Sequence, residues 1–268
     1  MYAIGIDRGG SYTRLSVFDS SFNVINNYKF VTDSLEHSVK EILNIIQELK
    51  AEKIPTVISS KGAMARKNIK NKIRDYMTEN LSKKINLKAI ISDAEGAHLA
   101  AFDEGNGFLI IIGTGSVLIY KKDGQYLIEG GKNPEGGDPG SGKWIAIKYL
   151  KGLNKNFDTW NEQLIASYTT EVIKKAKDDK NELCLQILNE AFIELSKLIS
   201  QAMLKFDDIK ELKIALYGGL SNDEYFRNGL SRYVNENIKN VNISFFVPET
   251  TIEKASALLA IKLEQNNK

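Results

Sequence analysis

The chain of 268 residues is long enough for two domains of ordinary size, and its composition, 43% hydrophobic and 26% charged, is that of a globular protein. The net charge is only +2 and no run of like charges stands out, so we expect no nucleic-acid partner. The longest apolar run, Phe108 to Ile112, is too short to span a bilayer, so we expect no membrane contact. The single cysteine, Cys184, excludes a disulfide or a cysteine-ligated iron–sulfur cluster within the chain. The first residues lack the basic and apolar segments of a signal peptide, and the expected compartment is the cytoplasm.

The first part of the chain alternates strands with helices. Short apolar runs, or alternating polar and apolar residues, predict strands at 3–6, 14–18, 24–30, 56–59 and 87–91. Apolar residues recur at helical spacing from Leu35 to Leu49 and predict a helix there, and further helices are expected at 64–81 and from Ala94 onward. The helix at 64–81 is basic, which a solvated face explains better than a nucleic-acid contact.

The same order of elements returns after the turn at residues 103–107. Strands are predicted at 108–112, 116–121, 126–128, 212–217 and 243–247, and helices at 144–152, 158–177, 182–206, after Gly219 and at 250–266. This repetition indicates an internal duplication. It predicts an α/β chain with two domains, 1–105 and 106–268, around a cleft, in which the last helix can pack back on the first domain.

Each half begins with a glycine-bearing turn between two strands: Asp7-Arg8-Gly9-Gly10-Ser11 in the first and Gly113-Thr114-Gly115-Ser116 in the second. Backbone N–H groups in such turns can point at a phosphate, because glycine tolerates a positive φ and carries no obstructing side chain. Neither turn is a Walker A motif, which carries Gly-Lys-Ser/Thr and leads into a helix. Taken singly, each is more often an ordinary hairpin. Their equivalent positions in the two repeats favour a shared phosphate-binding role.

Two aspartates follow strands closely. Asp7 comes directly after an apolar strand, and it either forms a local turn or holds Mg²⁺ beside the phosphates. Asp93 lies at the carboxyl end of the strand 87–91, where open α/β sheets bind ligands. Either Ser92 or Asp93 caps the following helix. Alternatively, Asp93 is a base that accepts the proton of a hydroxyl group attacking phosphorus. His98, farther along that helix, is better explained as a packed side chain than as a second base.

Two further glycine-rich segments carry candidate ligand contacts. The loop 136–142 contains Asp138, whose carboxylate can hydrogen-bond vicinal hydroxyls of a sugar. Gly218-Gly219 follow the strand 212–217 and would let a flat ring such as adenine lie against the backbone. An ordinary turn between a strand and a helix is the alternative.

Taken together, these segments resemble the N-acetylglucosamine kinase and benzoyl-CoA-reductase-activator branch of the actin-like ATPase/sugar-kinase superfamily. The resemblance spans nearly the whole chain and rests on segments in the family's order, namely residues 4–14, 92–97, 112–116, 137–145, 216–220 and 256–260. It implies two ribonuclease-H-like domains around a nucleotide cleft, with ATP and Mg²⁺ as cofactors. Iron–sulfur activators of this branch need cysteines that this chain lacks.

The resemblance also implies roles for the matching residues. Asp93 is the expected catalytic base and Asp7 the expected metal ligand. The expected cofactor-binding residues are Gly9, Gly10, Ser11, Thr13, Gly113, Thr114, Gly115, Ser116, Gly218 and Gly219. The expected reaction transfers the γ-phosphate of ATP to a hydroxyl group of a small carbohydrate.

The identity of the acceptor depends on departures from the family pattern. Gly131-Lys132-Asn133 stand where N-acetylglucosamine kinases of this branch usually carry Gly-Trp-Gly, so the aromatic wall is missing. Positive charges occur near the ligand loops, at Arg8, Lys61, Arg66, Lys132 and Lys143. Because a carboxylate in a cleft needs charged donors, these residues favour a sugar acid. Some archaeal members of the branch phosphorylate 2-keto-3-deoxygluconate, which we place slightly ahead of N-acetylglucosamine and glucose. We expect Asp138, Asp93, Lys132 and Ser60 to contact the acceptor.

Two other functions remain open. A non-phosphorylating ATPase could act on a partner protein, and a sugar-binding sensor could lack catalysis. The intact Asp93 and both glycine turns argue against the sensor. The expected partners are therefore ATP and a small-molecule carbohydrate, with a homodimer left open.

Overall fold

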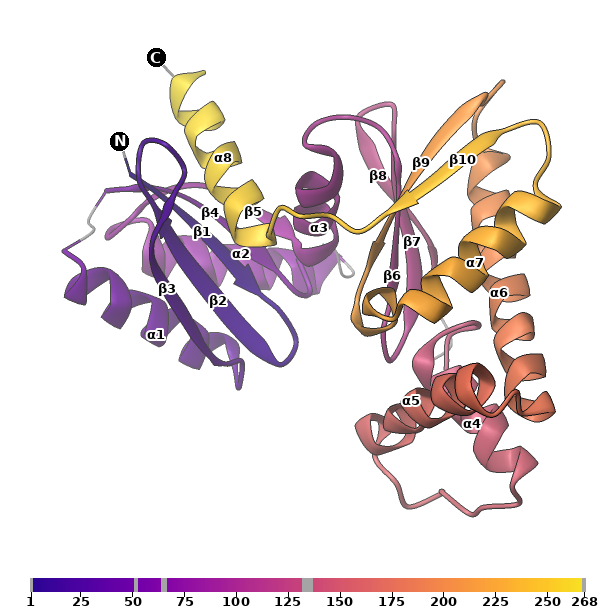
Figure 1. Ribbon diagram of the computed structural model, residues 1–268. Helices are drawn as coiled ribbons and strands as arrows, with labels where there is room; N and C mark the ends of the chain where they lie inside the picture. Colours follow the sequence, from indigo (N-terminus) through magenta and orange to yellow (C-terminus); the bar gives the residue numbers. More distant parts are fainter. Residues whose placement is uncertain (1, 51–52, 64–66, 132–136, 267–268) are drawn as a thin grey trace. The chain divides into compact units, whose positions relative to one another are not determined.

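The computed structural model describes residues 2–50, 53–63, 67–131 and 137–266 (Figure 1). The chain divides into two compact units, residues 1–104 with 249–268, and residues 105–248. The predicted division assigned 106–268 to the second domain. Residues 249–268 group with the first unit, on which the prediction allowed the last helix to pack.

The first unit is built on a five-stranded sheet in the order β3-β2-β1-β4-β5. Its strands are β1 (Ala3–Arg8), β2 (Tyr12–Phe18), β3 (Val24–Val31), β4 (Pro55–Ser60) and β5 (Asn86–Ser92). Its helices are α1 (Leu35–Glu48), α2 (Lys67–Leu81), α3 (Asp93–Phe102) and α8 (Ile252–Gln265). β1 pairs antiparallel with β2 and parallel with β4, and β4 pairs parallel with β5.

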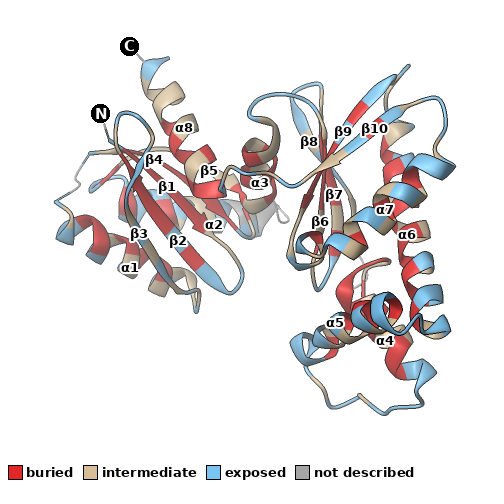
Figure 2. Cartoon of the chain, in the orientation of Figure 1, coloured by how far each residue is buried: buried red, intermediate tan, exposed pale blue. Residues whose placement is uncertain are grey.

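Alternate residues of β1 face different helices. Ile4 and Ile6 lie in a core with apolar side chains of α1 and α2. Ala3 lies in a separate cluster with Ala257 of α8. Because helices cover both faces, β1 and β4 are buried along nearly their whole length, as the red ribbon in Figure 2 shows. This burial explains why their sequences read as continuous apolar runs.

α8 lies so close to β1 that only glycine fits at the crossing. A Cβ atom added to Gly5 would lie 1.7 Å from the carbonyl oxygen of Glu253, which excludes any side chain there. The contact brings the start of α8, including the buried Glu253, next to the strand that ends at Asp7 and Arg8.

The second unit repeats the sheet of the first. Its strand order is β8-β7-β6-β9-β10, in which β8 corresponds to β3 and β10 to β5. Its strands are β6 (Phe108–Ile112), β7 (Ser116–Lys122), β8 (Gln125–Gly130), β9 (Glu211–Tyr217) and β10 (Asn242–Phe246). Its helices are α4 (Gly142–Gly152), α5 (Glu162–Asp178), α6 (Glu182–Met203) and α7 (Glu224–Asn237), with a short 3₁₀ helix, η1 (Gly219–Asn222). The expected α/β fold with two related domains is confirmed. In chain order, α4, α5 and α6 lie between β8 and β9, whereas the first unit has the single helix α1 between β3 and β4.

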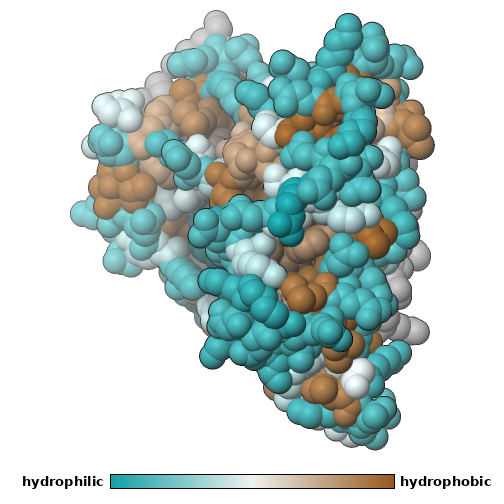
Figure 3. Space-filling model, turned by 45° about the vertical axis from the view of Figure 1, so that its right-hand side comes forward, coloured by the Kyte–Doolittle hydropathy of each residue, from teal (hydrophilic) through white to brown (hydrophobic). Residues whose placement is uncertain are grey.

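Most predicted elements form within a few residues of the expected bounds. α5 is an exception, because the helix predicted from residue 158 begins only at Glu162, after the side chain of Asn161 caps it by accepting a hydrogen bond from Leu164 N–H. No helix in the described part of the chain is long and apolar enough to cross a membrane. On the face drawn in Figure 3, hydrophilic groups separate the hydrophobic ones.

Candidate active site

Three strands of the first unit end at the same level of the sheet. Arg8 of β1 pairs with Ser60 of β4, and Ser60 pairs with Ser92 of β5. The strands run parallel, so their carboxyl ends share one edge, where α/β sheets bind ligands. The next residue along each strand is Gly9, Lys61 or Asp93. The first glycine turn and the predicted base therefore leave the same edge, with Lys61 following the strand between them.

Asp93 is not the helix cap. Ser92 caps α3, because its Oγ accepts from Glu95 N–H at 3.0 Å while the Glu95 carboxylate accepts from Ser92 N–H at 2.7 Å. Asp93 is the first helical residue, and its Oδ1 accepts a hydrogen bond from Ala94 N–H at 3.1 Å. Burial raises the pKa of Asp93, against the lowering effect of nearby backbone N–H groups and of Lys61. The raised pKa and the position at the strand end suit a proton acceptor.

Asp7 lies on the face of β1 that meets α8. Its side chain is buried, and Oδ2 accepts from Arg14 Nη1 at 3.0 Å. The pKa of Asp7 is raised to about 6, first by burial and then by the charge of Glu253, with Asp93 adding a little. Arg14 lowers the pKa but does not offset these effects. A cation would stabilise the ionised form, and carboxylate oxygen is the donor that Mg²⁺ prefers, so Asp7 fits the predicted metal role. No group of at least three His, Cys, Asp or Glu side chains in the described residues is arranged to hold a metal ion.

Arg8 and Ser60 contact each other on the opposite face of the sheet. The guanidinium of Arg8 donates to Ser38 Oγ at 3.2 Å and to Ser60 Oγ at 3.5 Å. Ser60 is fully buried. Thr13 is also buried, and its hydroxyl hydrogen-bonds Thr32 Oγ1 at 2.8 Å. These contacts hold the base of the first turn, and direct roles for Ser60 in acceptor binding and Thr13 in nucleotide binding stay predictions.

Each glycine turn is closed by a backbone hydrogen bond from its leading glycine, which reaches three residues ahead in the first turn and two in the second. Gly9 N–H donates to Tyr12 O at 3.1 Å in the first turn, and Gly113 N–H donates to Gly115 O at 2.9 Å in the second. Residues at the tips are exposed, namely Gly10 and Ser11 in the first turn and Thr114 and Gly115 in the second. The tips are therefore better placed than the leading glycines to donate N–H groups to a phosphate.

The loop before α4 packs directly on the second glycine turn. Ser116 N–H donates to Asp138 Oδ2 at 3.3 Å, and Ser116 Oγ donates to Pro139 O at 2.8 Å. Gly142 N–H donates to Gly113 O at 2.8 Å. The structure thus brings Asp138 beside Gly115 and Ser116, where its carboxylate orders the turn. Sugar binding by Asp138 stays a prediction.

Gly218 and Gly219 differ sharply although they are neighbours. Gly218 has a φ of 99°, and an added Cβ atom would lie 2.5 Å from Ile112 O, at the end of the strand that leads into the second turn. At Gly219 an added Cβ atom would meet nothing within 4 Å. Gly218 therefore has a structural reason to be glycine, whereas Gly219 leaves open space beside the backbone.

The positive charges expected to hold an acidic acceptor have different environments. Lys132 and Arg66 lie outside the described residues. Lys143 is buried, and its ammonium lies 2.6 Å from Glu162 Oε1. Arg8 is occupied by the two serines described above. Of the described members of this set, Lys61 alone has neither an ion pair nor a side-chain hydrogen bond with the described residues, and it directly follows the end of β4.

The sequence matches the family model described as the BadF/BadG/BcrA/BcrD ATPase family over residues 4–249. The chain belongs to this family. The predicted resemblance to the actin-like ATPase superfamily is thereby confirmed.

The curated relative shares only moderate sequence identity with the chain. The chain is 29% identical over 178 residues to a protein named N-acetylmuramic acid/N-acetylglucosamine kinase from Clostridium acetobutylicum, and the alignment covers 61% of this chain and 57% of that relative. The chain thus spans little more than half the length of this curated relative.

Solved structures match over the whole chain. A proposed N-acetylmannosamine kinase from Listeria monocytogenes has a TM-score of 0.72 at 13% identity, with 100% of both chains covered. A ROK hexokinase from Thermus thermophilus has a TM-score of 0.62 at 16% identity, again with 100% of both chains covered. At such identities the likeness shows the fold alone.

The sequence did not indicate that Glu253 lies near Asp7. Glu253 follows the last strand by several residues and opens α8, yet it lies beside Asp7 and raises the pKa of that carboxyl group. The sequence pattern shows an ordinary acidic residue in the first turn of a helix. Only the return of α8 to β1 reveals the proximity.

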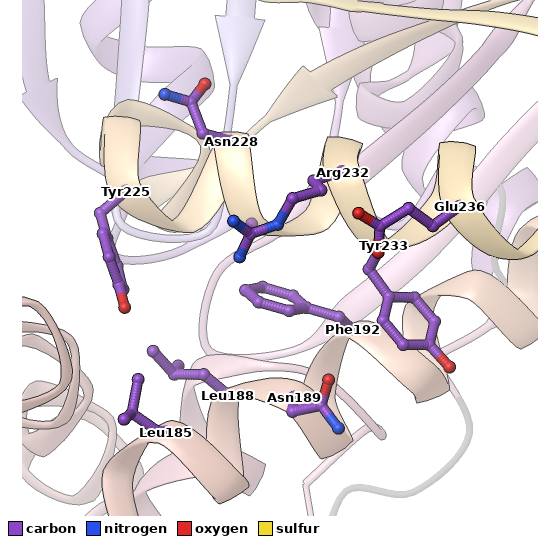
Figure 4. A pocket seen from close by; sticks show the side chains of 10 residues that line it. Leu185, Leu188, Asn189, Phe192, Tyr225, Asn228, Arg232, Tyr233 and Glu236 are labelled. Atoms are coloured by element: carbon purple, nitrogen blue, oxygen red, sulfur yellow. The ribbon is translucent and has the colours of Figure 1, made fainter. Parts of the chain in front are cut away.

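A pocket of about 460 Å³ lies between α6 and α7 (Figure 4). Arg232 extends from α7 toward the ring of Phe192 on α6, and Tyr225 and Tyr233 flank it. The two helices come close because Gly229 carries no Cβ atom, which would lie 2.6 Å from the Phe192 ring. None of the predicted site residues lines this pocket.

Proposed function

We propose that this chain is an ATP-dependent carbohydrate kinase, with Asp93 as the base for the acceptor hydroxyl. The observation that carries the proposal is the placement of Asp93 at the shared edge of the three strands. Its side chain does not cap α3, because Ser92 does, and its pKa is raised. A carboxylate tuned toward neutral pH accepts a proton more readily than an ordinary surface aspartate.

The reaction that fits these residues is an in-line displacement at phosphorus. The acceptor oxygen forms a bond to the γ-phosphorus, the bond from that phosphorus to the leaving oxygen of ADP breaks, and the hydroxyl proton passes to Asp93. Gly10 and Ser11 of the first unit would supply backbone N–H groups for the phosphates. Phosphate binding by Thr114 and Gly115 of the second unit is a separate prediction from the second glycine turn. Gly218 and Gly219 would border the adenine.

Magnesium fits this chemistry through Asp7. When bound with ATP, the ion neutralises charge on the phosphate oxygens. Asp7 would hold it, directly or through water, and Arg14 keeps the carboxylate oriented through the 3.0 Å ion pair. Glu253 adds to the negative potential that attracts the ion.

For the acceptor, an N-acetylated amino sugar has better support than 2-keto-3-deoxygluconate. The curated relative carries a name that refers to N-acetylmuramic acid and N-acetylglucosamine, which are both N-acetylated amino sugars. The pairing of Lys143 with Glu162 and the engagement of Arg8 with serines also weaken the case for an acceptor held by many cations. One acidic amino sugar, N-acetylmuramic acid, remains compatible with a single cation.

The test is a coupled ADP-release screen over glucose, N-acetylglucosamine, N-acetylmannosamine, N-acetylmuramic acid and 2-keto-3-deoxygluconate, with product phosphorylation checked by mass spectrometry. We expect an amino sugar to give the highest kcat/KM. ADP release that no sugar stimulates would instead favour an ATPase that acts on a partner protein, and transfer to 2-keto-3-deoxygluconate alone would restore the sugar-acid hypothesis.

A further inference from the structure

Lys61 occupies a position that the sheet order makes special. β4 lies between β1 and β5, so the residue after β4 lies between the residues that follow the other two strands. The register aligns Arg8, Ser60 and Ser92 across the three strands. Lys61 is therefore flanked by the first glycine turn on one side and by Asp93 on the other.

The backbone of Lys61 is held firmly although the side chain is exposed. Lys61 N–H donates to Arg8 O at 2.8 Å, and Lys61 O accepts from Ser60 Oγ at 3.3 Å. The chain then turns, with Ala63 N–H donating to Ser60 O at 3.1 Å and Ala63 buried. These contacts fix the backbone position of Lys61, and this position limits the region that its ammonium group can occupy.

The ammonium of Lys61 lies over the tip of the first glycine turn. A Cβ atom added to Gly10 would lie 2.8 Å from Lys61 Nζ and 3.3 Å from Lys61 Cδ, so the side chain runs along the Gly10 backbone. Its charge also reaches Asp93, whose pKa it lowers. The ammonium is thus close both to the backbone expected to bind phosphate and to the expected base.

Phosphoryl transfer is accelerated by a positive charge close to the transferring group. Negative charge spreads over the three equatorial oxygens of the phosphoryl group during transfer, and a fixed cation that meets this charge lowers the barrier. Lysine supplies a compact positive charge on a flexible stem, which can follow the group as it moves.

From this geometry we propose that Lys61 is a catalytic cation that contacts the phosphoryl group in transfer, between the Gly10 turn and Asp93. The proposal rests on the proposed kinase function and adds a residue to it. It differs from the earlier expectation that Lys61 holds an acidic acceptor.

The experiment compares Lys61→Met and Lys61→Arg with Lys40→Met, a control at an exposed lysine of α1. In steady-state assays with the best acceptor, Lys61→Met is expected to lower kcat by roughly 10²–10³-fold, the scale of losing one preorganised electrostatic contact, while the KM for the acceptor changes by less than about threefold. Lys61→Arg should recover part of the loss, and Lys40→Met should match the parent protein.

A binding measurement separates this proposal from the proposed function. Calorimetry with Mg²⁺ and ADP, with and without aluminium fluoride as a mimic of the transferring phosphoryl group, needs no knowledge of the sugar. Lys61→Met is expected to bind ADP as the parent does but to lose at least about tenfold in affinity for ADP with aluminium fluoride.

Unchanged kcat and unchanged aluminium fluoride affinity in Lys61→Met would overturn the proposal. So would a loss confined to the KM of acidic acceptors, because Lys61 would then contact the acceptor. If the parent protein phosphorylates no sugar, the kinase assignment fails, and the aluminium fluoride measurement still decides the role of Lys61.

Discussion

The ammonium of Lys143 lies 2.6 Å from the carboxylate of Glu162, at the place where the glycine-rich loop enters α4. The lysine side chain is 9% exposed and the glutamate side chain 62% exposed. The cation is thus directed toward the start of α5 and joins two neighbouring helices of the second unit. This ion pair gives Lys143 a structural explanation that needs no ligand.

Removing Glu162 should therefore cost more stability than removing Lys143. Glu162→Gln leaves a buried ammonium without this partner, which typically costs about 1–3 kcal/mol in the free energy of unfolding. Lys143→Met removes the charge itself and should lie within about 1 kcal/mol of the parent. Urea titrations at pH 7 measure both.

Glu194→Gln is the matched control, because Glu194 pairs with Lys197 on the same helix with both side chains partly exposed. Its cost should stay under about 0.5 kcal/mol. If Lys143→Met instead left stability unchanged but removed activity toward acidic acceptors alone, the cation would belong to the substrate site.

Asp93→Asn tests the proposed base. The amide cannot accept the hydroxyl proton, so kcat should fall by roughly 10²–10⁴-fold while the affinity for ATP is retained. Because Ser92 rather than Asp93 caps α3, the thermal midpoint should change little. Ser92→Ala is the control with the opposite pattern, since losing the cap costs about 1 kcal/mol of stability.

The pH dependence of Asp93 follows from the direction of its pKa shift. The pKa is raised from 3.8, so the fraction of ionised base, and with it kcat/KM, should decline at a higher pH than an ordinary aspartate would produce. Asp93→Asn should abolish this acidic limb. Full turnover in the asparagine variant would show that another group accepts the proton.

Local patterns were sufficient to predict most strands, the repeat and the strand-end position of Asp93. Apolar runs and glycine turns are local features, and parallel strands bring their carboxyl ends together whatever the loops do. The pairs Asp7–Glu253 and Lys143–Glu162 depend on how distant helices return to the sheet or to each other, so spacing in the sequence could not predict them. The cap of α3 was undecided for a similar reason, because Ser92 and Asp93 are both good cap residues until the backbone angles select one.

Gly218 and Gly219 provide a pair of substitutions that separates folding from binding. Gly218→Ala places a side chain at a φ of 99° and 2.5 Å from Ile112 O, so the free energy of unfolding should fall by about 2–5 kcal/mol. Gly219→Ala meets nothing within 4 Å and should leave the free energy of unfolding within about 1 kcal/mol of the parent. Denaturant titrations measure the difference.

If Gly219 borders the adenine as proposed, Gly219→Ala should raise the KM for ATP several-fold without loss of stability. An unchanged KM would place the adenine elsewhere. Gly113→Ala is a parallel test at the second turn, where an added Cβ atom also meets nothing within 4 Å.

Asp7→Asn should make the protein more stable and less active. The pKa of Asp7 is raised from 3.8 to about 6, so ionising this buried carboxyl group above pH 6 costs the folded state free energy that the unfolded chain does not lose. A shift of this size corresponds to at most about 3 kcal/mol, and asparagine removes the cost because it carries no charge. Arg14 loses its partner, but its side chain is 46% exposed and water replaces the contact.

The sign of the pH effect makes this prediction specific. Above pH 6 Asp7 is charged in both states, so the parent should be less stable than Asp7→Asn by a constant amount. As the pH falls from about 6 toward 3.8, the folded state takes up the proton before the unfolded state does, and the difference should shrink. Denaturant titrations of both proteins from pH 8 to pH 4.5 measure this convergence. If the two curves stay parallel over that range, the carboxyl group is not strained by burial, and its proposed attraction for Mg²⁺ loses its physical basis.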